Sequence, residues 1–154
     1  MRNVHVWIIA LIVMLAIFWL SNIPHLSLYD SSSLSLEMKR FIKKYTFRIG
    51  NKGFFSYVIS PHPDFILHKI GHIFAFGSLG VLLYTATQSI HWAVIITTIF
   101  AASDELHQYF VAGRSSRFGD ILLDTVAAFV FICIYLRIKR PGKKKTLSES
   151  NRDQ

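Results

Sequence analysis

The strongest constraint on the fold is a set of four long apolar runs, at residues 4–20, 65–84, 92–110 and 118–136. Each run is about 17 to 20 residues long, roughly what a helix needs to cross about 30 Å of hydrocarbon. Lipid cannot satisfy exposed backbone groups, so segments that cross it are expected to be helical. The sequence therefore predicts an all-α, polytopic membrane protein built as a bundle of four transmembrane helices.

The loop between the first two runs contains a second helical pattern, within residues 33–47. The apolar positions of this pattern are Leu34, Met38, Phe41, Ile42 and Tyr45. Its opposite side carries Lys39, Arg40, Lys43 and Lys44. Such two-sided segments are typical of amphipathic helices that lie on a membrane surface. A solvated loop with scattered apolar residues is the alternative.

The formal net charge of +8 raises the question of nucleic-acid binding. The positive residues flank apolar segments and do not form a basic face with interleaved aromatic residues, so we expect no nucleic-acid partner. Clusters beside membrane helices instead attract anionic lipid head groups and help to set topology. We therefore expect membrane lipids as partners.

The charges also suggest a domain organisation. Residues 1–140 are predicted to form the transmembrane domain, and residues 141–154 a disordered basic tail. An even number of helices places both termini on one side of a multi-pass protein, and the basic tail favours the cytoplasmic side of the cell membrane. The sequence does not indicate an oligomeric state.

Polar residues interrupt three of the apolar runs near one end of each. Lys69 and His72 lie near the start of the second run, and Asp120 and Asp124 lie near the start of the fourth. Asp104, Glu105 and Gln108 lie near the end of the third run. Short turns make consecutive helices antiparallel neighbours, so these three helix ends should reach the same leaflet. A charged side chain at a helix centre costs about 2.5 to 3.5 kcal/mol on insertion scales, which favours partners or water. We therefore predict one polar pocket that opens on the outer face.

The residue types suggest roles in that pocket, although the sequence leaves open whether the protein is an enzyme. Glu105 or Asp120 is the candidate general base, and His72 is an alternative proton carrier. Lys69 and Arg114 are candidates to hold an anionic group such as a phosphate or carboxylate. The remaining candidate substrate-binding residues are Gln108, Asp104 and Asp124. Asp104 and Glu105 are adjacent, hence about 100° apart on a helix, so both need not face one centre.

Two other functions fit the same residues. His68 and His72 are four residues apart and could face a metal ion, with Asp104, Glu105 or Asp120 completing its shell, as in a metal-dependent membrane hydrolase or transferase. A single histidine pair is a weak signal, and we assign no metal ligand and expect no cofactor. The other possible function is that of a non-enzymatic assembly or transport unit, in which the polar residues hold the helices together.

Two segments carry a resemblance to a known family. The segment "HKIGHIFAFGSLGVLLY", followed by "SDELHQYFVAGRSSRFGDILLDTVAAF", resembles the VanZ-like family of small bacterial integral membrane proteins. The family pattern is a Lys-x-x-His, an Asp-Glu-x-x-Gln-x-Phe, a Gly-Arg turn, and an Asp followed four residues later by Asp or Asn. The matching residues are Lys69, His72, Asp104, Glu105, Gln108, Phe110, Gly113, Arg114, Asp120 and Asp124.

The sequence departs from this family at several positions. Ala75 stands where many relatives carry a glutamate, Ala112 where proline is common, and Ala127 and Ala128 where a stretch contains glycine. The resemblance implies a bacterial cell-envelope protein, connected through the family's namesake with resistance to the glycopeptide antibiotic teicoplanin. The polar pocket would then bind or modify a cell-wall precursor or an anionic lipid.

Overall fold

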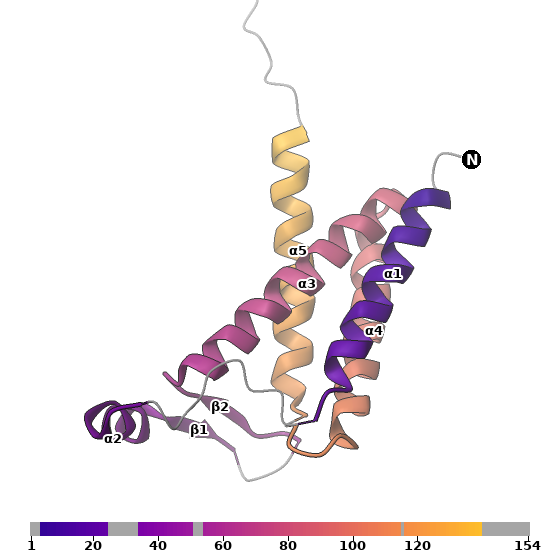
Figure 1. Ribbon diagram of the computed structural model, residues 1–154. Helices are drawn as coiled ribbons and strands as arrows, with labels where there is room; N and C mark the ends of the chain where they lie inside the picture. The colour runs from indigo at the N-terminus through magenta and orange to yellow at the C-terminus, as the bar shows by residue number, and fades with distance from the viewer. Residues whose placement is uncertain (1–3, 25–33, 51–53, 115, 140–154) are drawn as a thin grey trace, which may run out of the picture.

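The computed structural model describes residues 4–24, 34–50, 54–114 and 116–139, so the predicted basic tail lies outside the described residues. The elements are α1 (Val4–Ser21), α2 (Leu36–Tyr45), β1 (Phe47–Ile49), β2 (Tyr57–Ile59), α3 (Pro63–Thr87), α4 (Ile90–Tyr109) and α5 (Phe118–Lys139). The long helices α1, α3, α4 and α5 form the body of the molecule, and α2 lies with the two strands beside one end of it (Figure 1).

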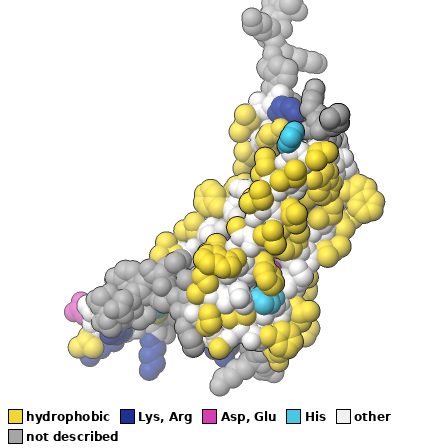
Figure 2. All heavy atoms as spheres, turned by 45° about the vertical axis from the view of Figure 1, so that its right-hand side comes forward, with side chains coloured by type: hydrophobic (Ala, Val, Ile, Leu, Met, Phe, Trp, Pro, Cys, Tyr) yellow, Lys and Arg dark blue, Asp and Glu magenta, His cyan; other side chains and the backbone are white. Residues whose placement is uncertain are grey.

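Three of the described helices, α1, α3 and α5, are long and apolar enough to cross a membrane by length and composition. The fourth long helix, α4, does not belong to this set, and it carries Asp104 and Glu105 near its end. Figure 2 shows hydrophobic side chains spread over one face of the helical body, with Lys and Arg side chains near its two ends. The protein is therefore a largely helical membrane protein, while the count of four spans remains a prediction.

The long helices alternate in direction. Gln88 ends α3 in the left-handed conformation with a φ of 56°, and the Ser89 hydroxyl caps the start of α4 by accepting the Trp92 N–H at 3.5 Å. This short turn makes α3 and α4 neighbours of opposite direction, as the sequence predicts. The end of α1, the start of α3, the end of α4 and the start of α5 all meet at one end of the body (Figure 1).

Small residues bring α3 and α5 close together. A Cβ atom added to Gly80 would lie 2.7 Å from the Ala128 Cβ, and one added to Gly77 would lie 2.6 Å from the ring of Phe131. In lipid, where burial of apolar surface gives little driving force, such close approach allows helices to pack by dispersion forces. Thr98 on α4 and Thr125 on α5 add a hydrogen bond of 3.0 Å between their hydroxyls. These contacts hold the three C-terminal helices in register.

The predicted amphipathic helix is present as α2. Its N-cap is Ser35, whose hydroxyl accepts the Met38 N–H at 3.2 Å, and none of its residues is buried. Figure 1 shows α2 nearly end-on, whereas α5 runs along the plane of the picture, so α2 lies crosswise to the long helix. The location of α2 at a membrane surface remains a prediction.

The structure adds a small sheet that the all-α prediction omits. Strands β1 and β2 pair antiparallel, with Phe47 opposite Ile59 and Ile49 opposite Tyr57. The backbone of Phe118 donates a hydrogen bond of 2.9 Å to the Phe54 carbonyl, which ties the segment before β2 to the start of α5. Strands of only three residues carry too few alternating positions to be recognised by their period.

Candidate functional site

The site lies where the helix ends meet, and its centre is a group of buried polar side chains. The group consists of Asp104 (2% exposed), Glu105 (1%), Gln108 (4%), Asp120 (7%) and Asp124 (1%). All belong to α4 or α5, and all are among the candidates that the sequence predicts. Burial of so many polar groups is costly unless each finds a partner.

The first partner is Lys69 on α3, whose ammonium group pairs with the Asp120 carboxylate on α5. The same ammonium lies 5.5 Å from the ring centre of Tyr57 and 5.3 Å from that of Phe65. Burial raises the pKa of Tyr57, and the Asp120 charge adds to the increase. The ion pair joins α3 to α5 and stabilises Asp120 in a setting with little access to water.

The second partner is His72, one turn further along α3. Its Nδ1 lies 3.1 Å from the Asp124 Oδ2, and its ring stacks on Phe76 at 5.7 Å between ring centres. The other carboxylate oxygen of Asp124 is buried and has no partner among the described protein atoms. His72 and Asp124 therefore form a second polar link across the same helix pair.

Glu105 and Asp104 point to different neighbours, consistent with their adjacent positions on α4. The Oε2 of Glu105 accepts the backbone N–H of Arg117 at 2.7 Å, just before α5 begins. The Oδ2 of Asp104 accepts the Gln108 side-chain amide at 2.8 Å, and the same amide donates to the hydroxyl of Ser21 at 3.3 Å. Glu105 thus connects α4 to the residue before α5, and Gln108, which also donates to Asp104, connects α4 to the end of α1.

Two contacts with the end of α1 were not foreseen from the sequence. Ser21 is 4% exposed and accepts from Gln108, and the Leu20 carbonyl accepts the Arg114 Nη2 at 2.7 Å. A cation beside the carboxyl end of a helix also complements the helix dipole. Burial lowers the pKa of the Arg114 guanidinium, and the carboxylates of Asp104 and Glu105 oppose that decrease. A serine or a leucine that simply ends an apolar run gives no sequence signal of such a contact.

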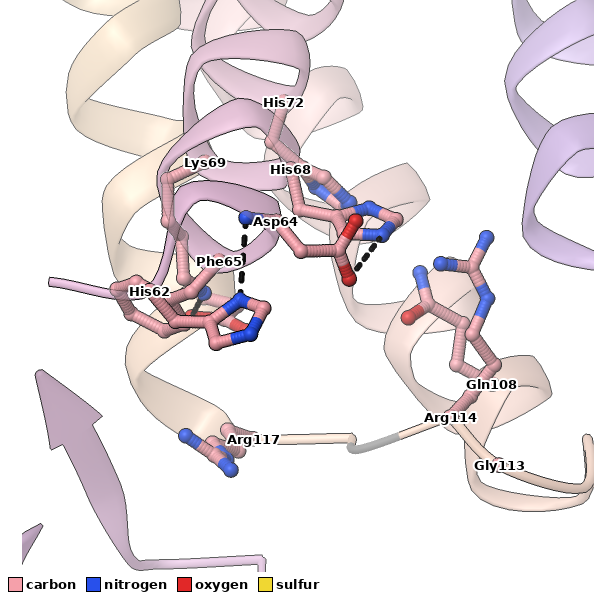
Figure 3. A pocket seen from close by; sticks show the side chains of 11 residues that line it. His62, Asp64, Phe65, His68, Lys69, His72, Gln108, Gly113, Arg114 and Arg117 are labelled. Atoms are coloured by element: carbon pink, nitrogen blue, oxygen red, sulfur yellow. Dashed lines mark hydrogen bonds and ion pairs between the residues drawn. The ribbon is translucent and has the colours of Figure 1, made fainter. Parts of the chain in front are cut away.

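Above this network lies a pocket of about 250 Å³ (Figure 3). Its lining consists of His62, Asp64, Phe65, His68, Lys69, His72, Gln108, Gly113, Arg114, Arg117 and Asp120. Of the predicted site residues, Lys69, His72, Gln108, Arg114 and Asp120 contribute to the lining, whereas Asp104, Glu105 and Asp124 do not. The buried carboxylates of α4 therefore lie beneath the pocket wall.

The pocket wall carries more basic than acidic side chains. Lys69, Arg114 and Arg117 contribute positive charge, against the carboxylates of Asp64 and Asp120. Asp64 lies 3.8 Å from the His68 Nε2, and its backbone N–H donates to the His62 Nδ1 at 3.2 Å, which caps the start of α3. Because Lys69 is paired with Asp120, Arg114 and Arg117 are the basic side chains of the wall that remain to contact an anionic occupant. The carboxylates of Asp104 and Glu105 interact with Arg114 from behind the wall and offset part of its charge.

The two histidines considered as metal ligands, His68 and His72, contact different carboxylates. His68 pairs with Asp64, whereas His72 pairs with Asp124. Within residues 4–24, 34–50, 54–114 and 116–139, no three His, Cys, Asp or Glu side chains are grouped so as to hold a metal ion. The described geometry therefore gives no particular support to the metal-dependent hypothesis.

Comparison with known proteins gives one match. A family model described as VanZ/LLP1 matches residues 6–139, which include α3, α4, α5, all but the first two residues of α1, and the whole site. No curated protein matches the chain, and no solved structure matches it.

Proposed function

The chain belongs to the VanZ/LLP1 family, and on that premise we propose that it binds the anionic group of a cell-wall or lipid component in the polar pocket. The observation that carries the proposal is the position of Arg114 and Arg117 on the wall of a pocket whose lysine is already paired with Asp120. Guanidinium groups present planar pairs of donors that match carboxylate and phosphate oxygens.

The size of the pocket supports a small group as its occupant. Pockets for drug-sized molecules usually measure about 300 to 1,000 Å³. The present pocket, at about 250 Å³, suits a phosphate, a carboxylate or a comparable headgroup better than a whole glycopeptide. A contribution to teicoplanin resistance would then act through a wall or lipid component, and not by enclosure of the antibiotic.

The proposed orientation places the pocket in the outer leaflet and both termini in the cytoplasm. The start of α1 and the end of α5 lie at the end of the body opposite the pocket, which supports an even number of spans (Figure 1). Arg137 and Lys139 in the last turn of α5 favour a cytoplasmic location for that end. In this orientation α2 lies at the outer membrane surface.

Binding is the part of the function that the geometry supports best. If a reaction follows, Asp120 and His72 are the candidate proton carriers that line the pocket. Glu105 lies beneath the wall, where its carboxylate accepts the Arg117 N–H, and it would influence chemistry through that backbone. Arg114 would hold the anionic group beside them.

The test is a binding titration of the purified protein with a lipid-linked wall precursor and, separately, with teicoplanin. We expect saturable binding of the precursor, loss of that binding in Arg114→Ala, and weak or absent binding of the antibiotic. Teicoplanin susceptibility of cells that express either form gives the matching phenotype. No saturable precursor binding, together with equal susceptibility of cells with wild type and Arg114→Ala, would exclude the proposal.

A structural clamp is a second candidate, because the polar groups also connect helices to one another. Lys69–Asp120 and His72–Asp124 join α3 to α5, and Gln108–Ser21 joins α4 to α1. A pure clamp predicts that conservative replacements disrupt folding in detergent. A binding site predicts replacements at the pocket wall that leave folding intact and abolish binding.

A further inference from the structure

A second cavity adjoins the polar pocket, between α1 and α3. This cavity, called the α1–α3 groove below, measures about 200 Å³. Its apolar lining includes Ile17, Leu20, Leu67, Ala75 and Phe76. Three polar side chains, those of His68, His72 and Arg114, line both this groove and the polar pocket. A charged pocket and an apolar groove therefore meet at one boundary.

The groove is open towards the side of the helical body. Leu20 and Leu67 on its two walls are 49% and 43% exposed. Gly71 also lines the groove, and a Cβ atom added there would meet nothing within 4 Å. Both walls belong to helices that are long and apolar enough to cross a membrane, so we expect the open side of the groove to face the lipid.

We propose that the occupant of both cavities is one amphiphile, an anionic membrane lipid. Its phosphate or carboxylate lies against Arg114 in the polar pocket, and one hydrocarbon chain lies in the α1–α3 groove. This inference rests on the proposed function, because it assigns the anionic group of the ligand to the same pocket. A free anion would leave the groove without an occupant, whereas a lipid enters sideways from the bilayer and fills both parts.

The two parts contribute differently to recognition. Lipid chains are as apolar as the side chains of the groove, so moving a chain from bilayer to groove gains little free energy. Selection between lipids therefore comes from the headgroup at Arg114, and the groove determines where the chain lies. A decisive experiment must locate the chain as well as measure binding.

The experiment uses the full chain in phosphatidylcholine nanodiscs with a phosphatidic acid that carries a photoreactive diazirine on its acyl chain. We expect cross-links concentrated at residues 17–21 and 67–76, and their loss when unlabelled phosphatidic acid competes. A diazirine phosphatidylcholine of the same chain length should label the exposed apolar surface without this concentration. Inorganic phosphate serves as a headgroup without a chain.

Gly71→Leu places a side chain in the groove and leaves the polar pocket unchanged. We expect the cross-links in the groove to fall to the level seen with the neutral lipid. The preference for phosphatidic acid over phosphatidylcholine should persist when it is measured by native mass spectrometry. The matched control is Ala102→Leu, at an exposed position of α4 outside both cavities, which should behave as the wild type. Size-exclusion elution checks that both variants fold.

The outcomes separate the two levels of the proposal. Saturable binding of phosphatidic acid with cross-links scattered over the whole apolar surface would overturn the groove assignment and leave the anionic pocket standing. No preference for phosphatidic acid over phosphatidylcholine, with no binding of inorganic phosphate, would overturn the anionic pocket and the groove assignment together.

Discussion

His72 on α3 lies 3.1 Å from Asp124 on α5, one helical turn from the ion pair of Lys69 and Asp120 on the same two helices. The two pairs are successive polar contacts between α3 and α5. The glycines of α3 allow these two helices to lie close together. A shift of either helix by one turn would separate both pairs. The two polar links therefore act together with the close contacts of Gly77 and Gly80 to fix the register of this helix pair.

Removal of Lys69 should destabilise the protein strongly. In Lys69→Met the Asp120 carboxylate, whose side chain is 10% exposed, loses its cationic partner. Breaking a buried ion pair typically costs about 3 to 5 kcal/mol, because one charge remains buried without compensation. We expect a loss of free energy of unfolding of about 3 kcal/mol, measured by SDS titration in mixed micelles.

The double variant Lys69→Met with Asp120→Leu is the control for that prediction. Replacing both partners by apolar residues is often nearly neutral, so most of the lost stability should return. If the double variant is as unstable as the single one, the packing of the lysine stem, and not its charge, stabilises this helix pair.

Gly80 and Gly71 on α3 should respond oppositely to the same substitution. In Gly80→Ala the new Cβ meets Ala128 on α5, and overpacking of this kind typically costs about 1 to 3 kcal/mol. In Gly71→Ala the new Cβ meets open space, and alanine favours a helix over glycine by about 1 kcal/mol. The SDS midpoint should fall for the first variant and stay equal or rise for the second. Equal midpoints would mean that α3 and α5 can separate without cost.

The meeting of the helix ends could be predicted because the apolar runs and the short turns leave few arrangements. Segments of such length joined by a turn as short as that at Gln88 must run antiparallel, and this places Lys69, Glu105 and Asp120 at one end. The length of α4 follows from the same pattern, but its last turns, with Asp104, Glu105, His107 and Gln108, make it the least apolar of the long helices. Sequence length alone therefore does not establish a fourth span.

The individual partners could not be predicted. Helices α3 and α5 are apolar on nearly all sides, so their sequences do not show which side faces a neighbour. The pairing of Lys69 with Asp120, and of His72 with Asp124, depends on that rotation. The contact of Ser21 with Gln108 spans most of the chain, and no local pattern indicates it.

Glu105 should tolerate replacement by glutamine but not by alanine. Its Oε2 accepts the backbone N–H of Arg117, and a glutamine carbonyl oxygen can accept the same hydrogen bond. In Glu105→Ala this partly buried donor loses its acceptor, and a donor left unsatisfied in a buried position typically costs about 1 to 3 kcal/mol. Glu105→Gln should therefore unfold near the wild-type SDS midpoint and Glu105→Ala well below it. A Glu105→Gln protein that fails to fold would instead favour the structural clamp.

Arg114 should contribute both to the docking of α1 and to the binding of an anion. In Arg114→Ala the Leu20 carbonyl loses its donor. Hydrogen bonds to charged groups contribute about 1.5 to 3 kcal/mol, but this one is exposed and water can replace the lost donor. We expect a loss of stability below that range and the loss of phosphatidic-acid binding. Arg114→Lys keeps the positive charge but lacks the planar donors of the guanidinium. It should therefore retain part of the phosphatidic-acid binding and less of the stabilisation that comes from the hydrogen bond to the Leu20 carbonyl.

Arg117→Ala is the matched control, because Arg117 lines the same pocket but stabilises Glu105 through its backbone N–H, which alanine retains. Its unfolding midpoint should stay near that of the wild type, whereas its affinity for phosphatidic acid should fall because one positive charge is lost from the pocket wall. If Arg114→Ala and Arg117→Ala lose stability equally, the hydrogen bond to Leu20 does not determine the docking of α1. If Arg117→Ala binds phosphatidic acid as tightly as the wild type, only Arg114 recognises the anion.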